Sequence, residues 1–148
     1  MQQVKSYIAR AETNVCFRPI ADIALAMRAY AMRAELKGIH SVDAELESYV
    51  PDNDAFCVLV TAQIGTLGSK EADNFNFYVC SPQWLSLQLE TDKVVSGRHH
   101  FFMSEFDLAS LEAYVVKRVR QAEGADWAAI AAKLARWSHW EFEDYAGS

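Results

Sequence analysis

The stretch Ala55-Phe-Cys-Val-Leu-Val-Thr-Ala-Gln-Ile-Gly65 decides the fold, because its residues fall into two alternating sets. One set is Phe56, Val58, Val60, Ala62 and Ile64, and the other is Cys57, Leu59, Thr61 and Gln63. Successive side chains of a strand point to opposite faces of a sheet, so the alternation predicts a strand with one buried side. Asn74–Cys80 alternates again through Phe75, Phe77 and Val79. The polar segment 65–74 between the two runs predicts an antiparallel hairpin.

Three helices are predicted from capping residues and from a change of period. Ser81 is a good N-cap and Pro82 needs no N–H at the first helical position, so Gln83–Glu90 is expected to be a short helix. Its expected core-facing residues are Trp84, Leu85 and Leu87. Asp107 and Asp126 are expected to cap two longer helices with apolar stripes. The stripes are Leu108, Leu111, Val115, Val119 and Ala122, before Gly124, and then Trp127, Ile130, Ala131, Leu134 and Trp137.

Two further strands are expected at Arg33–His40 and His99–Ser104. In the second, Phe101 and Met103 would face one side, with His100 and Phe102 on the other. Strands followed by helices favour an α+β protein with an antiparallel sheet of about four strands, covered on one face by helices. A length of 148 residues with 51% hydrophobic composition suits a single domain.

Residues 1–31 differ in charge from the remainder of the chain. They carry four basic and two acidic groups, a net charge of +2, which leaves ten basic and eighteen acidic groups, a net charge of −8, for residues 32–148. We interpret 1–31 as an N-terminal extension, dispensable or the product of a misassigned start codon, and 32–148 as the α+β domain. The alternative is a genuine N-terminal helix over Arg18–Met32.

The closing stretch from Trp137 to Tyr145 places four aromatic rings among three carboxylates. Disordered ends are usually poor in aromatic residues, so this end is expected to be docked. If it is extended, Trp140 and Phe142 point inward and Glu141 and Glu143 point to water. The residues expected to clamp the core or to contribute to an interface are Trp84, Trp137, Trp140, Glu141 and Phe142.

An acidic stretch precedes the hairpin. Between Ser41 and Asp54 the chain carries no Lys or Arg and five carboxylates, which are Asp43, Glu45, Glu47, Asp52 and Asp54. Such a surface repels phosphate backbones, which argues against direct nucleic-acid binding, and it would steer a basic partner toward these residues. The alternative is a solvated loop that only keeps the protein soluble.

The composition also indicates the cellular compartment in which the chain is expected to act. No run approaches the roughly 18 apolar residues of a membrane-spanning helix, and the N-terminus lacks the apolar centre of a signal peptide. Cys16, Cys57 and Cys80 are odd in number and form no CxxC pair. Free thiols that pack as small hydrophobic groups suit a reducing cytoplasm, so the expected location is cytoplasmic and no membrane partner is expected.

The sequence offers little catalytic chemistry. No HExxH, GxSxG or glycine-rich phosphate motif occurs, and His99 and His100 lie on opposite faces of a strand, so neither a metal site nor a cofactor is predicted. One alternative is a small acid–base enzyme that uses Glu141, Glu143 and His139 in a Trp-lined pocket. Another is a carbohydrate-binding module whose tryptophans lie flat on the surface. The preferred interpretation is a protein without catalysis.

From Met32 onward the chain resembles the bacterial immunity protein 8 family. The resemblance is carried by the opening Met32-Arg-Ala-Glu-Leu-Lys-Gly-Ile-His-Ser41, the junction Phe75-Asn-Phe-Tyr-Val-Cys-Ser-Pro-Gln-Trp-Leu85, the His99/His100 strand, the Trp127…Ala131…Leu134 helix and the closing Trp140-Glu-Phe-Glu-Asp-Tyr145. It implies an α+β protein that binds and blocks a cognate toxin domain of a polymorphic toxin system. A basic nuclease domain would complement the acidic charge. The extension 1–31 departs from the family pattern.

The composition change at Met32 predicts that residues 1–31 contribute little to folding. A chain beginning at Met32 should unfold within about 2 kcal/mol of the full chain, because a dispensable extension buries little apolar surface against the core. Thermal unfolding of the two chains measures the difference. A larger loss would show that the extension packs on the domain.

Overall fold

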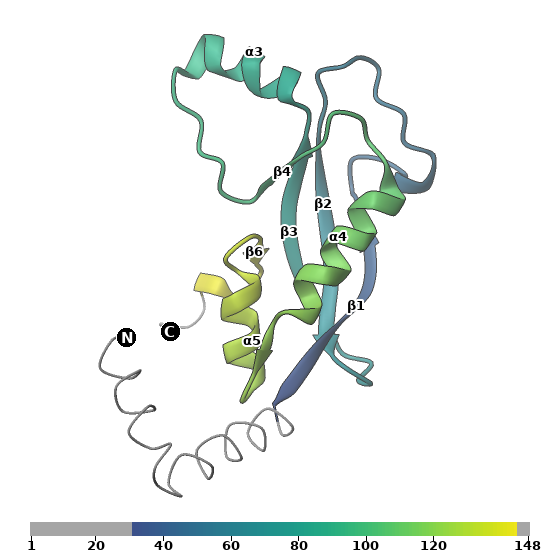
Figure 1. Ribbon diagram of the computed structural model, residues 1–148, viewed down its shortest axis with the longest axis vertical. Helices are drawn as coiled ribbons and strands as arrows, with labels where there is room; N and C mark the ends of the chain where they lie inside the picture. The colour runs from purple at the N-terminus through teal and green to yellow at the C-terminus, as the bar shows by residue number, and fades with distance from the viewer. Residues whose placement is uncertain (1–30, 145–148) are drawn as a thin grey trace, which may run out of the picture. The chain divides into compact units, whose positions relative to one another are not determined.

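The computed structural model describes residues 31–144 (Figure 1). Residues 1–30, which include Cys16, and residues 145–148, which include Tyr145, lie outside the described residues. The elements are β1 (Met32–His40), the 3-10 turn η1 (Leu46–Ser48), β2 (Cys57–Thr66), β3 (Asp73–Cys80), α3 (Pro82–Asp92), β4 (His100–Phe102), α4 (Leu108–Arg120), β5 (Glu123–Gly124), α5 (Trp127–Leu134) and β6 (His139–Trp140). Strands and helices are mixed as the α+β prediction requires.

The sheet is larger than expected and is mixed. Its strand order is β4-β3-β2-β1-β5, and β6 adds to β3. The predicted hairpin is confirmed, with β2 and β3 antiparallel from Cys57 opposite Cys80 to Ile64 opposite Asp73. The prediction of about four antiparallel strands was wrong in detail, because β4 runs parallel to β3 and the described residues add β5 and β6. These two strands have two residues each, too few to show an alternating pattern.

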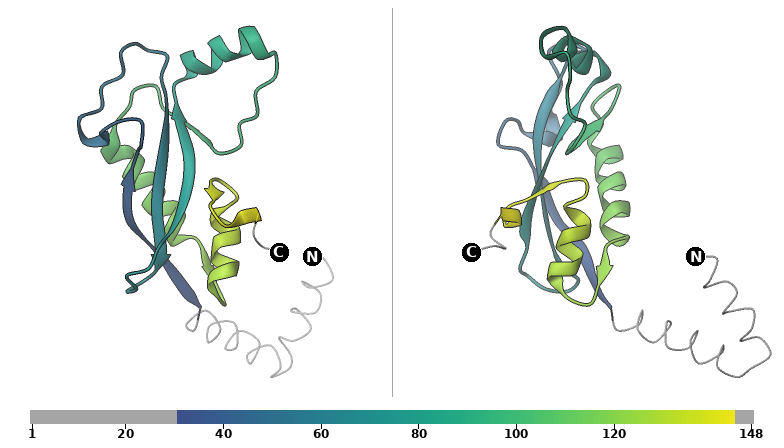
Figure 2. Two further views of the ribbon diagram at one scale, coloured as in Figure 1. Left: turned by 180° about the vertical axis from the view of Figure 1, so that it is seen from behind. Right: turned by 90° about the vertical axis from the view of Figure 1, so that its left-hand side faces the viewer.

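The predicted inward face of the hairpin forms the core. Val60, Ala62, Ile64, Phe75, Phe77 and Val79 have no solvent exposure. The predicted helical stripes meet them, through Leu111, Val115 and Val119 of α4 and through Ile130, Ala131 and Leu134 of α5. In the edge-on view of Figure 2, α4 lies along one face of the sheet. The α+β layer is therefore held together by burial of two patterned surfaces against each other.

Two of the three predicted helix caps are made as expected. The Ser81 hydroxyl accepts a hydrogen bond from the backbone N–H of Trp84 at 3.2 Å and another from Phe56 at 3.1 Å. The Asp126 carboxylate accepts from the N–H of Ala129 at 2.8 Å. Asp107 occupies its N-cap position, but its carboxylate accepts from the Ser110 hydroxyl and makes no bond to the helix backbone.

The prediction that α3 turns Trp84, Leu85 and Leu87 into the core was wrong. No residue of α3 is buried, and Leu87 is 52% exposed. Figure 1 shows the reason, because α3 extends away from the sheet and a long loop returns from it to β4. Trp84 packs through its indole on the His100 ring instead, with centroids 5.8 Å apart.

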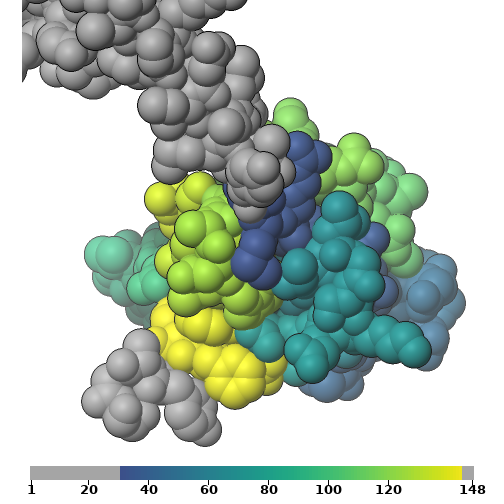
Figure 3. All heavy atoms as spheres, turned by 90° about the horizontal axis from the view of Figure 1, so that it is seen from below, coloured from purple at the N-terminus to yellow at the C-terminus, as the bar shows by residue number. Residues whose placement is uncertain are grey.

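The closing stretch is docked, as predicted. Trp137 is 7% exposed, and the Trp140 indole stacks on Phe75 with centroids 6.3 Å apart. One oxygen of Asp73 accepts from the indole N–H of Trp140 at 2.9 Å and from that of Trp127 at 2.7 Å. Figure 3 shows the closing residues, in yellow, against the β2–β3 region, in teal.

The expected alternation of the closing stretch ends at Trp140. Phe142 is 41% exposed, so its predicted inward position was wrong, and the Glu143 side chain is 26% exposed and not fully in water. The physical reason is that β6 covers only His139–Trp140 and a turn follows. Outside an extended segment, successive side chains no longer face opposite ways.

We expect Trp140→Ala to destabilise the protein by about 3 kcal/mol, because it removes an indole packed on the core and leaves a cavity. Trp140→Phe should be milder, about 1.5 kcal/mol, since it keeps an aromatic ring on Phe75 and loses the bond to the Asp73 carboxylate and part of the ring area. Urea unfolding measures both. Leu87→Ala on exposed α3 is the control and should stay within about 0.5 kcal/mol of wild type. Trp140→Ala at that same level would show that the indole is not structural.

Candidate functional site

The acidic stretch forms the loop between β1 and β2, at the end of the sheet from which α3 also leaves (Figure 1). All five predicted partner-binding carboxylates, Asp43, Glu45, Glu47, Asp52 and Asp54, are exposed. Within residues 31–144 none of them forms an ion pair with a Lys or Arg. Their charge is therefore directed to solvent without local neutralisation, which is the condition for steering a basic partner.

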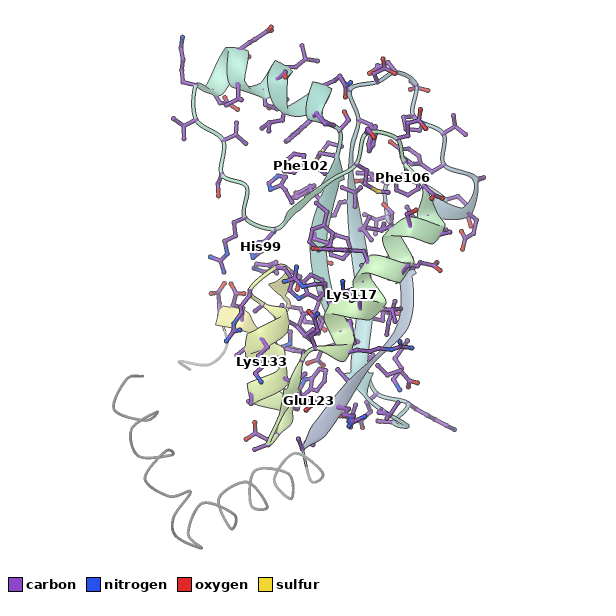
Figure 4. All side chains as sticks on the ribbon, viewed as in Figure 1. His99, Phe102, Phe106, Lys117, Glu123 and Lys133 are labelled. Atoms are coloured by element: carbon purple, nitrogen blue, oxygen red, sulfur yellow. The ribbon has the colours of Figure 1, made fainter. Side chains whose placement is uncertain are left out.

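This acidic loop is anchored to the domain at several points. Leu46 in η1 is 4% exposed, and the Tyr49 ring meets Phe106 edge-on with centroids 4.9 Å apart. Figure 4 labels Phe106. The hydroxyl of Ser41 donates to the carbonyl oxygen of Leu59 at 2.5 Å, and Asp43 accepts weakly from the N–H of the same residue at 3.3 Å. A loop fixed in this way presents its carboxylates with little ordering entropy left to lose on binding.

Two valines of the acidic loop are unusually open. Val42 is 78% exposed and Val50 is 80% exposed. Exposed apolar side chains beside unpaired charges resemble the mixed composition of a protein–protein interface, in which apolar contacts lie inside a polar rim. The sequence had marked the charges of this loop but not the valines, since a lone Val in a polar stretch carries no periodic signal.

A second exposed surface surrounds His100, which we call the aromatic patch and define as Tyr78, Trp84, His100 and Phe102. The His100 ring stacks with Tyr78 at 5.3 Å, with Trp84 at 5.8 Å and with Phe102 at 6.2 Å between centroids. The prediction that His100 and Phe102 share the side of β4 opposite Phe101 is confirmed, since Phe101 packs against the core and Phe102 is 43% exposed. Stacking within the patch accounts for the half-buried Trp84.

The residues of the acid–base alternative have separate structural roles. Glu141 accepts from the backbone N–H of Asn74 at 2.6 Å, whereas Glu143 faces Arg98 at 3.6 Å. His139 is exposed, and its ring lies 5.8 Å from that of His99 between centroids. A hollow of about 440 Å³ beside β4 and α4 is lined by other residues, among them Phe102 and Tyr114. Glu141 and Glu143 therefore have different partners and are not arranged as an acid–base pair.

His99 lies where the loop that returns from α3 meets the segment after α5 (Figure 4). Burial lowers the pKa of the His99 imidazole below its ordinary value, and the positive charge of Arg98 lowers this pKa further. The Arg98 Nε–H donates to His99 Nε2 at 3.0 Å, so Nε2 carries no proton and the imidazole is neutral.

The structure does not provide the flat tryptophan platform that a carbohydrate-binding module needs. All four tryptophans lie within the described residues, and each is buried or half-buried. Residues 31–144 also contain no group of three or more His, Cys, Asp or Glu placed to hold a metal ion. No helix in the described part of the chain is long and apolar enough to cross a membrane.

Sequence reasoning missed a pairing of thiols. Cys57 and Cys80 are free, as expected, but their sulfur atoms lie 2.8 Å apart. The thiol of Cys80 donates to that of Cys57, which lowers the pKa of Cys57 and raises the pKa of Cys80 far above its ordinary value, an effect that burial reinforces. The signal was present in the hairpin, since the alternating runs place the two residues opposite each other at its open end.

The fold and the site together define a small α+β domain that presents an anchored acidic loop. The model of the family described as immunity protein 8 matches residues 34–145, well over half of the chain. The chain belongs to this family. No match was found among curated proteins or among solved structures.

The depressed pKa of His99 predicts a pH-dependent stability. In the unfolded chain the imidazole takes up a proton near its ordinary pKa of about 6.5, whereas the folded state takes it up only at lower pH. The unfolded state then binds more protons, so stability falls as the pH drops below about 6.5. His99→Asn should reduce this loss, and Asn tolerates the left-handed backbone at φ 64°.

Urea midpoints at about pH 5 and about pH 7.5 measure the effect. His40→Asn, at an exposed histidine, is the matched control for loss of an imidazole. An identical pH dependence in wild type and His99→Asn would contradict the prediction.

Proposed function

We propose that this protein is an immunity protein that binds and neutralises a cognate toxin domain of a bacterial polymorphic toxin system by stoichiometric protein–protein inhibition. Membership of the immunity protein 8 family supports a toxin partner. The observation that carries the choice of surface is the anchored loop with five exposed carboxylates and no ion-pair partner among residues 31–144. In this proposal the protein has no catalytic activity of its own and acts in the cytoplasm.

The acidic loop would act first by attraction and then by contact. Unpaired carboxylates accelerate the encounter with a basic surface, and the effect weakens with salt. Val42 and Val50 then supply apolar area that carboxylates cannot. Because the loop is held through Leu46 and the Tyr49–Phe106 ring pair, binding needs little rearrangement of the inhibitor.

The partner is expected to present a basic cleft, and a nuclease domain fits this requirement. Nucleases bind phosphate backbones through Lys and Arg. The five carboxylates can occupy such a cleft and exclude its substrate. The same charge makes direct binding of this protein to nucleic acid unfavourable, so the proposed contact is with the toxin alone.

The proposal is tested by charge reversal in the acidic loop. Glu45→Lys combined with Glu47→Lys should slow association with the toxin domain about tenfold at low salt and flatten its salt dependence, because both side chains are exposed and act on encounter. The partner is the toxin domain encoded beside the gene for this chain, once co-purification establishes the pair. Stopped-flow binding across a salt series measures the rates.

A matched control reverses the same number of charges elsewhere. Glu71→Lys combined with Asp144→Lys changes two exposed carboxylates outside the acidic loop. This variant should keep near-wild-type association at physiological salt, where distant charges are screened. Equal effects of the two double variants would show that only net charge matters. Association indifferent to both would move the interface away from the acidic loop.

A further inference from the structure

Cys57 and Cys80 occupy a specific position in the β2–β3 ladder. The backbone N–H of Ser81 donates to the carbonyl oxygen of Phe56 at 3.0 Å, so Phe56 and Ser81 form a hydrogen-bonded pair just outside the first register pair of the hairpin. Hydrogen-bonded and non-hydrogen-bonded pairs alternate along an antiparallel ladder. Cys57 opposite Cys80 is therefore a non-hydrogen-bonded pair, the type in which facing Cα atoms lie closest, about 4.5 Å apart.

This position suits a disulfide. Native disulfides span Cα separations of about 4.4–6.8 Å, and a non-hydrogen-bonded pair falls within that range. Both side chains lie on the same face of the sheet, and their sulfur atoms are already 2.8 Å apart. Bond formation requires the sulfurs to close to about 2.0 Å, a movement that side-chain rotation can supply without moving the strands.

The two thiols differ in access and in acidity. Cys57 is half-buried, whereas Cys80 has no solvent exposure. The hydrogen bond from Cys80 lowers the pKa of Cys57, although burial and the nearby negative charge of Asp43 oppose this effect. The thiolate is the reactive form of cysteine, so Cys57 is the side chain that a dissolved oxidant meets first.

We propose that Cys57 and Cys80 form a site of reversible thiol oxidation whose oxidant is a low-molecular-weight disulfide. The Cys57 thiolate attacks one sulfur of the disulfide and forms a mixed disulfide, and the other half leaves as a thiolate. Cys80 then attacks the Cys57 sulfur and expels the second half as a thiolate, which takes up the proton that Cys80 gives up. Two protein thiols lose two electrons, one disulfide gains them, and the two leaving thiolates are protonated to thiols.

This inference stands apart from the proposed function, since it needs no toxin. It assigns Cys57 as the attacking thiol and Cys80 as the resolving thiol. The new bond would join the start of β2 to the end of β3, next to the points where the acidic loop enters the sheet and α3 leaves it. The charge of Asp43 in the acidic loop acts on Cys57, and Phe102 of the aromatic patch pairs with Cys80, so both surfaces border this site.

The test treats the folded full chain with glutathione disulfide and counts free thiols. The chain has three cysteines, so the count should fall from three to one if Cys16 stays free. Peptide mapping should recover one linked fragment that contains Cys57 and Cys80, and the intact mass should fall by two hydrogen atoms. Dithiothreitol should restore all three thiols. Retention of all three thiols, or linkage through Cys16, would overturn the proposal.

Matched variants separate the two roles. Cys80→Ser removes the resolving thiol, so a stable glutathione adduct should accumulate on Cys57. Cys57→Ser should leave Cys80 at least about tenfold slower to react, because Cys80 is buried. Equal rates of adduct formation on Cys57 in Cys80→Ser and on Cys80 in Cys57→Ser would contradict the assigned order. A glutathione adduct that persists on Cys57 in wild type would contradict the resolving step. The wild-type thiol count does not depend on the folding of either variant.

Discussion

The pairing of β2 with β3 is the constraint on which the other elements depend. β1 adds to β2, and the second edge of β3 is shared by two short strands far apart in sequence. β4 pairs with the end of β3 at Tyr78–Cys80, and β6 pairs near its start at Phe75–Asn76. The inward face of this hairpin has no solvent exposure over most of its length. A slip of one residue would turn every buried side chain to the opposite face, so the register is strongly specified.

Asp73 fixes how the C-terminal part of the chain meets that hairpin. Its carboxylate oxygen accepts from the indoles of Trp127 and Trp140, and these belong to α5 and β6. Charge-assisted bonds are stronger than neutral ones, and their geometry is directional. Apolar burial holds α5 on the sheet, and the Asp73 bonds orient one ring at the start of α5 and one ring in β6.

The surfaces that carry our proposals lie at the opposite end of the hairpin. There the acidic loop precedes β2 and α3 follows β3 (Figure 1). Cys57 and Cys80 pair at this end of the hairpin. The Ser81 hydroxyl connects the end of the acidic loop to the start of α3, since it accepts hydrogen bonds from the backbone N–H of Phe56 before β2 and of Trp84 in α3. The core thus sets the spacing of a charged loop, which adds Leu46 to the core, and of a helix with no buried residue.

The sequence by itself determined the hairpin, its buried face, the stripes of α4 and α5, and the caps at Ser81 and Asp126. These depend on local periodicity and on side chains near their own backbone, so a single stretch carries the information. It also marked the five carboxylates of the acidic loop. Their exposure follows from the structure, and their role in binding remains a proposal.

Only the tertiary structure decided the remaining features. The parallel direction of β4, the two-residue strands β5 and β6, the outward course of α3 and the position of Phe142 each depend on partners remote in sequence. The same holds for the separate partners of Glu141 and Glu143 and for the contact between Cys57 and Cys80. A periodic pattern specifies which face of a segment is apolar. It does not specify which distant segment covers that face, because this choice is made by packing and register among all the elements at once.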